Sequence, residues 1–278
     1  MSSDQIELFS SERGDFDVVT VDGVFMATRT DVAKKVTFDE KTSNLNTLLQ
    51  NFSQTKQEKL ASLSIPTRKT ESWKYSAKRL KLANQYPAVL QQVSNYQAAY
   101  DLDCHQLLIS NESITLNETE IEGLTVKLFS DLNDTEATEV ISGLVAESND
   151  FHFADINAAQ LQNGIYLNVA DNAQIDKPVK IVFEHIGQGM SFPRVFVSVG
   201  KSAAFKLIEE LNISANNNQE AFINSVCDIT VSENAQLHYI RMNIDQGAGK
   251  HVGATGVKLQ RNARFNSDCM ALGSELGR

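Results

Sequence analysis

The chain has 278 residues, of which 42% are hydrophobic, and this suffices for one or two domains with a substantial core. Its formal net charge of −10 disfavours nucleic acid and anionic membranes as main partners, because both attract a surplus of Lys and Arg. No apolar run approaches the roughly 18 residues of a membrane span, and no secretory signal begins the chain. Three widely spaced cysteines fit a reducing compartment. We therefore expect a cytoplasmic protein.

The first half of the chain, residues 1–150, is predicted to be a mixed α and β region. Valine-rich stretches on either side of Asp22-Gly23 indicate a pair of strands joined by a tight turn. From Asn46 onward apolar residues recur at helical spacing, so this region is expected to be helical around 46–80.

Shorter elements are predicted between the helical part and residue 150. Three short runs typical of strands occupy 106–109, 114–116 and 124–129. The stretch Asn133-Asp134-Thr135-Glu136 has the form of a capping box, in which a cap residue precedes a glutamate by three positions. It predicts a helix that begins there.

The second half, residues 151–278, repeats one pattern four times: an alternating strand, a polar turn with an alanine, and an apolar restart. The alanines, separated by 30, 32 and 28 residues, are Ala173, Ala203, Ala235 and Ala263. Such a repeat of strands with period two is typical of a solenoid, in which coils stack and each buries one face. An antiparallel sandwich also has regular strands but does not need the same corner four times. We predict a mainly β fold with a β-solenoid core.

Residues for catalysis or metal binding do not converge in the sequence. The five histidines are dispersed, and no C-x-x-C, H-E-x-x-H or phosphate-binding glycine pattern occurs. Cys227 and Cys269 are in phase with apolar residues of their strands, so we expect both to be buried rather than ligands. His238 is out of phase with its apolar neighbours and is expected to face solvent. We predict no catalytic, cofactor-binding or metal-ligating residue.

The segment Pro66–Tyr75 holds the only tryptophan and mixes aromatic with charged side chains. One interpretation is structural: Trp73 and Tyr75 anchor the helical region to the solenoid while the charged side chains are solvated. The other is a protein interface, because Trp, Tyr and Arg are enriched at interfaces. The candidate interface residues are Arg68, Lys69, Glu71, Trp73, Lys74 and Tyr75.

Several stretches together are similar to the SufD-type proteins of iron–sulfur cluster assembly. The sequence of 66–75, P-T-R-K-T-E-S-W-K-Y, resembles their P-x-R-K-x-E-x-W-K-Y motif. Other similar stretches are Phe153–Ala159, Arg194 with the strand after it, Glu209-Glu210, Ala221–Asn224 and Gly273–Arg278. The resemblance covers the chain from about residue 60 to its end.

The resemblance implies a right-handed parallel β-helix, flanked by helical parts, in a non-catalytic scaffold subunit. Such subunits act with the paralogous SufB and with SufC, an ABC-type ATPase. The complex would then handle the iron–sulfur cluster and the partner would bind ATP, while this chain alone binds no cofactor. SufB-type chains carry an E-G-C motif where this one has Glu209-Glu210-Leu211, which favours the SufD type.

The resemblance also raises an expectation about length, because SufD-type chains extend further. This chain is expected to stop mid-solenoid at Arg278, to be poorly soluble or to self-associate, and to lack the part that docks SufC.

Two alternatives belong to other functional classes. Carbohydrate-active enzymes also use parallel β-helices, but they need paired carboxylates or a cationic base on one solenoid face. The outward row expected for this chain has no acid pair; it comprises Asn168, Ser198, Asp228 and Lys258. A SufB-like cluster carrier would need exposed cysteines. We therefore expect a scaffold rather than an enzyme.

Overall fold

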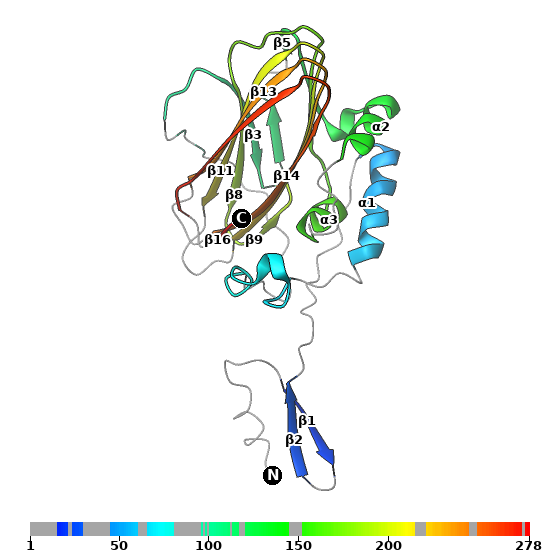
Figure 1. The fold of residues 1–278 in the computed structure, drawn as a ribbon, viewed down its shortest axis with the longest axis vertical. Helices are drawn as coiled ribbons and strands as arrows, with labels where there is room; N and C mark the ends of the chain where they lie inside the picture. Colours follow the sequence, from blue (N-terminus) through cyan, green and yellow to red (C-terminus); the bar gives the residue numbers. More distant parts are fainter. Residues whose placement is uncertain are drawn as a thin grey trace.

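The computed structural model of the chain describes residues 16–21, 24–29, 45–60, 66–80, 96, 98, 100–111, 113–116, 120–144, 152–214, 221–244, 249–273 and 276–278. Two long sheets form the main body and lie face to face around a common core (Figure 1). We call them the first and the second sheet.

The first sheet has eight strands among the described residues. In spatial order they are β16 (Leu276–Gly277), β14 (Lys250–Leu259), β12 (Ala221–Val231), β10 (Arg194–Val199), β7 (Ile165–Val169), β6 (Leu124–Leu128) and β5 (Glu120–Ile121), with β9 (Gly189–Ser191) beside β12. The second sheet has six in the same part of the chain. They are β15 (Arg264–Ala271), β13 (Gln236–Asn243), β11 (Ala204–Ser214), β8 (Val179–Ile186), β3 (His105–Ser110) and β4 (Ser113–Leu116).

From β7 onward the chain winds between the two sheets, and consecutive coils pair in parallel. In the first sheet Val197 lies beside Ile229, and in the second Phe205 lies beside Leu237. Strands that precede residue 150 extend the same sheets, because β3 pairs in parallel with β8 and β6 pairs antiparallel with β7. The result is a β-solenoid of about three turns, which confirms the predicted fold class.

Alternating side chains of both sheets fill the space between them. Leu167, Val197 and Ile229 stack in one row and are fully buried. Each such aliphatic side chain contributes on the order of 1.5–3 kcal/mol when it is removed from water. The core therefore runs along the solenoid axis without a break between coils.

Each coil changes sheet at a residue with a left-handed backbone. The four residues and their φ angles are Asn172 (64°), Ser202 (55°), Asn234 (59°) and Asn262 (58°). Each of the four repeated alanines follows directly. After Ala203, Ala235 and Ala263 the next residue's amide donates to the alanine carbonyl one coil earlier, as Gln236 does to Ala203. The predicted equivalent corners are confirmed. The residue before the alanine makes the turn, since Asn tolerates positive φ better than most residues.

Three α-helices cover the outer face of the first sheet (Figure 1). They are α1 (Thr47–Leu60), α2 (Asp134–Gly143) and α3 (His152–Ala159). The predicted capping box is present, since Asn133 Oδ1 accepts from the Glu136 amide at 2.9 Å and Glu136 accepts from the Asn133 amide at 3.1 Å. Helical periodicity predicted α1 and α2 but missed α3.

The predicted N-terminal strand pair is also present. β1 (Phe16–Val21) and β2 (Val24–Arg29) are antiparallel, with Val21 opposite Val24. The turn expected at residues 22–23 lies outside the described residues.

A buried ion pair holds α3 on the first sheet. Arg194 Nη2 donates to Asp228 Oδ2 at 2.8 Å, and Nη1 donates to Asn157 Oδ1 at 3.3 Å. The amide nitrogen of Asn157 in turn donates to the Asn224 carbonyl at 2.7 Å. Removing one partner of such a pair typically costs about 3–5 kcal/mol, because a charge is left unpaired in the interior.

The register corrects the outward row expected from the sequence. Asn168, Ser198, Thr230 and Lys258 are the residues that align across the coils. Asp228 lies two residues earlier, opposite Phe196, and is covered by the helices rather than exposed. The corner sets the register, and the residue five positions before the corner alanine is Thr230 in this coil. The corrected row also has no carboxylate.

Changing the corner residue Asn234 separates backbone strain from side-chain contacts. Asn234→Val and Asn234→Gly both remove the hydrogen bond that Asn234 Oδ1 accepts from Asn262 at 3.2 Å. Only valine resists positive φ, so we expect Asn234→Val to be less stable than Asn234→Gly by about 1–2 kcal/mol. Urea unfolding monitored by circular dichroism measures the difference. Equal unfolding midpoints would show that this backbone geometry does not limit stability.

Candidate functional site

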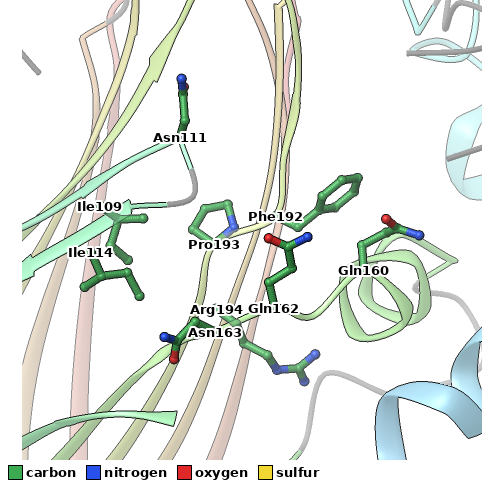
Figure 2. Close-up of a pocket in the computed structure, with 9 residues that line it drawn as sticks. All are labelled: Ile109, Asn111, Ile114, Gln160, Gln162, Asn163, Phe192, Pro193 and Arg194. Atoms are coloured by element: carbon green, nitrogen blue, oxygen red, sulfur yellow. The ribbon is translucent and has the colours of Figure 1, made fainter. Parts of the chain in front are cut away.

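A small hollow lies where β3, β10 and the end of α3 meet (Figure 2). Its volume of about 20 Å³ is room for a water molecule and not for a substrate. In Figure 2 the Arg194 side chain extends away from Ile109 and Ile114, toward the helices. Its guanidinium is already bound to Asp228. The hollow is therefore a packing gap beside the contacts of Arg194 with Asp228 and Asn157, which we call the α3 clamp.

The solenoid interior changes from apolar to polar along its axis. Ile181 in β8 aligns with Glu209 in β11, which aligns with Arg241 in β13 and then with Cys269 in β15. A group of polar side chains therefore lies between the sheets of the later coils. We call it the interior polar cluster; it comprises Glu209, Ser225, Cys227, Tyr239, Arg241 and His251.

Hydrogen bonds connect the members of the interior polar cluster. Tyr239 Oη donates to the Glu209 carboxylate, while Arg241 Nη2 lies 2.7 Å from His251 Nε2 and 3.3 Å from Ser225 Oγ. Because a guanidinium only donates, His251 Nε2 accepts and the ring carries its proton on Nδ1. Burial, and then the charge of Arg241, lower the pKa of His251 well below its usual value. The imidazole is therefore neutral at physiological pH.

Gly253 makes room for the Arg241 guanidinium. A Cβ atom at this position would lie 2.1 Å from Arg241 Nη2 and 2.8 Å from Ser225 Oγ. Any larger residue would have to displace the guanidinium from the solenoid interior. Glycine here is thus tied to the cluster rather than to a turn.

Cys227 is buried in the core, as predicted, beside the interior polar cluster. Burial raises the pKa of the Cys227 thiol well above its usual value, and the nearby Glu209 carboxylate raises it further. The thiolate is the form that attacks electrophiles and binds metals. Cys227 is therefore an unreactive thiol in this fold.

Cys269 was predicted to be buried, but it is exposed. Its position is in phase with the inward row, as the pattern indicated, because it aligns with Arg241. β15 pairs with β13 on one edge, and no described strand covers the other. The alternation of side chains along the strand correctly predicted the direction of the Cys269 side chain. Burial also requires a neighbouring strand that covers this side chain, and no described strand does so.

The 67–80 segment is a series of turns around the 3₁₀ helix η3 (Glu71–Trp73). Trp73 is buried, with its ring 5.3 Å from that of Phe153 and the Arg278 guanidinium 4.2 Å above it. The anchoring role predicted for Trp73 is confirmed. It is wrong for Tyr75, which is 87% exposed. Lys74, which lies between Trp73 and Tyr75, has helical backbone angles. Residues two apart in a helical turn point to nearly opposite sides, so Tyr75 points away from the side on which Trp73 is buried.

The remaining candidate interface residues all lie on the exposed side of the 67–80 segment; they are Arg68, Lys69, Glu71 and Lys74. The structure thus separates the segment into a buried anchor and a charged outer face.

The interior polar cluster was not predicted from the sequence. The available signal was the appearance of Glu209 and Arg241 at inward positions of strands whose other inward residues are apolar.

Residues 182–278 match the family model described as SUF system FeS cluster assembly, SufBD core domain. The later coils of the solenoid are thus similar to the SufBD core domain. The matched residues run from within β8 through the later coils, which hold the interior polar cluster. Arg194 and Asn157, in stretches that carried the resemblance, form part of the α3 clamp.

Two curated relatives are similar over most of the chain. One is an iron–sulfur cluster assembly SufBD family protein of Synechocystis sp., 23% identical over 84% of this chain and 56% of the relative. The other is the chloroplast protein ABCI7 of Arabidopsis thaliana, 24% identical over 83% of this chain and 51% of the relative. The chain spans about half the length of these relatives.

Two further kinds of feature, a metal-binding group and a membrane-spanning helix, are absent from the described residues. No group of three or more His, Cys, Asp or Glu side chains in that part of the chain is placed to hold a metal ion. Nor is any helix there long and apolar enough to cross a membrane.

His185 gives the fold a defined dependence on pH. Its ring is fully buried, with Nδ1 3.0 Å from Ser191 Oγ, and burial lowers its pKa to about 4. In the unfolded chain the pKa returns to about 6.5, so the unfolded state binds the proton first as the pH falls. The contribution of the neutral ring is complete above pH 6.5 or so and decreases toward pH 4.

We expect His185→Gln to lessen this loss of stability, because glutamine can hydrogen-bond but does not titrate. Between pH 8 and pH 5 the wild type should lose about 2 kcal/mol more of its free energy of unfolding than the variant. Urea unfolding at both pH values measures this. Parallel pH profiles for the two proteins would contradict the assignment.

Thiol labelling tests the contrast between the buried and the exposed cysteine. In a Cys104→Ser background, Ellman's reagent should modify Cys269 rapidly and Cys227 at least about a hundredfold more slowly, because Cys227 reacts only after the solenoid opens. Cys269→Ser should remove the fast phase and Cys227→Ser should leave it unchanged. A fast phase that disappears only in Cys227→Ser would show that Cys227 is accessible and reactive.

Proposed function

We propose that this chain is a non-catalytic, SufD-type scaffold subunit in iron–sulfur cluster assembly. The observation that carries the proposal is the match of the later solenoid coils to the SufBD core domain. The similarity to the Synechocystis relative, an iron–sulfur cluster assembly SufBD family protein, supports the same process.

The chemistry of the solenoid interior supports a scaffold rather than a cluster carrier. A carrier must present thiolates to iron or sulfur, and burial keeps the interior Cys227 protonated. Cys269 is the one exposed cysteine of the described residues, so a carrier role would depend on it. The Arg241 guanidinium is in contact with His251 and Ser225, and the Tyr239 hydroxyl is bound to Glu209. These groups hold one another in place. Their role in the proposal is to fix the spacing of the coils.

In this proposal the chain acts in the cytoplasm with a SufB-like paralogue and a SufC-type ATPase. ATP binds to the ATPase partner, and the cluster is handled by the assembled complex. Long parallel sheets suit a scaffold because their strands are hydrogen-bonded along the whole solenoid, which gives a rigid surface for docking.

Co-expression tests the assignment to a complex. The tagged chain, expressed with SufB-type and SufC-type proteins of one organism, should elute with the SufB-type protein in size-exclusion chromatography. Because the tagged chain is expected to lack the part that docks SufC, it should elute with the ATPase only when the SufB-type protein is present. Arg194→Ala, which breaks the α3 clamp, serves as the control for loss through misfolding. Elution of the folded chain without either partner would contradict the proposed partners.

Anaerobic reconstitution of the purified chain with ferrous iron and sulfide tests the scaffold role separately. We expect no stoichiometric iron and no cluster absorption. A cluster band that disappears in Cys104→Ser, Cys227→Ser or Cys269→Ser would instead support a SufB-like carrier.

A further inference from the structure

The outer face of the 67–80 segment is strongly basic in an otherwise acidic protein. This stretch has five basic residues and one acidic residue, whereas the whole chain has a net charge of −10. All five basic side chains are exposed; they are Arg68, Lys69, Lys74, Lys78 and Arg79. We call this face, together with Tyr75, the basic face.

Most charges of the basic face have no internal counterion. Within the described residues Arg68, Lys74, Lys78 and Arg79 form no ion pair. Lysines and arginines elsewhere in the described chain do form ion pairs, including Lys127 with Glu136 at 2.6 Å. The protein therefore carries a cluster of cations without ion pairs on one surface, although carboxylates outnumber basic side chains in the whole chain.

Tyr75 lies among these cations and is almost fully exposed. Its exposed fraction of 87% is the largest among the described large hydrophobic side chains, and its ring lies 5.5 Å from Lys74 Nζ. Tyr and Arg are the residue types that most often dominate binding energy at protein interfaces. An exposed tyrosine between cations gives the surface an apolar contact as well as charge.

The backbone below the basic face is held firmly. Trp73 inserts into a cluster with Phe153 and Phe222, and Arg278 donates to Ser76 Oγ at 2.7 Å while it stacks on Trp73. A hollow of about 510 Å³ adjoins the segment and is lined by Ser72, Tyr75, Ser76 and Arg79 on one side. The basic face is therefore a fixed surface with a recess that can take side chains of a partner.

We propose that the basic face is the docking surface for an acidic segment of a partner protein, with Tyr75 as its central contact. A protein segment fits better than nucleic acid or membrane because those polyanions extend beyond the patch. They would then meet the excess of carboxylates on the rest of the chain. A short acidic segment meets only the cations and the tyrosine. This surface is independent of the role in cluster assembly.

A charge-reversal variant with a matched control tests the proposal in the full chain. The patch variant is Arg68→Glu/Lys74→Glu/Arg79→Glu. The control is Lys201→Glu/Lys206→Glu/Lys258→Glu, which reverses three exposed lysines on the solenoid and produces the same change in net charge. Circular dichroism and thermal unfolding confirm that both are folded. The probe is a short fluorescein-labelled poly-glutamate peptide, whose binding is measured by anisotropy.

At a salt concentration of about 0.1 M the Debye length is about 10 Å, so the peptide senses the patch rather than the net charge. We expect the patch variant to bind the peptide roughly tenfold more weakly than wild type, while the control stays within about twofold. Tyr75→Ala should weaken binding about threefold and leave its salt dependence unchanged.

Equal affinities of the patch variant and the control would overturn the proposal. So would tighter binding by the wild type of a single-stranded RNA or of phosphatidylserine vesicles than of the peptide, since that would identify a different class of partner. An unchanged affinity of Tyr75→Ala would remove the tyrosine from the docking contact and reduce the surface to unspecific charge.

Discussion

The parallel register between coils is the constraint on which the rest of the structure depends. A left-handed residue followed by alanine turns the chain at every coil, and after Ala203, Ala235 and Ala263 the next amide donates to the coil before it. Because side chains alternate across a strand, a slip of one residue would move the core of a coil to the outside. The corner therefore decides which side chains face the axis and which face the helices.

The outer faces of both sheets are attached to their coverings by buried charges. On the first sheet Arg194 and Asp228 hold α3 through Asn157. On the second sheet Lys180 lies 3.5 Å from the carboxylate of Glu210, which also accepts a hydrogen bond from Tyr100 at 2.6 Å. Each of these buried charges would destabilise the fold if it were left without its partner. The pairing therefore fixes which segment packs on each sheet and also stabilises that packing.

Two groups of polar side chains lie in different surroundings: the interior polar cluster is buried, and the basic face is exposed to solvent. Inside the later coils burial keeps the Cys227 thiol protonated, because it raises the pKa of the thiol, and keeps the His251 ring neutral, because it lowers the pKa of the ring. On the 67–80 segment the basic side chains remain exposed above a buried tryptophan. The solenoid thus combines a buried, hydrogen-bonded polar interior with a charged outer face.

The sequence by itself determined the coils and the capping box before α2. These features depend on neighbouring residues along the chain, and alternation and turn chemistry are local. Tertiary structure decided that Asp228 is buried, that Tyr75 is exposed beside an anchored Trp73, and that Cys269 faces inward without being covered. It also brought Glu209, Arg241 and His251 together. Burial and proximity depend on which element covers a face, and residues far apart in the chain supply that element.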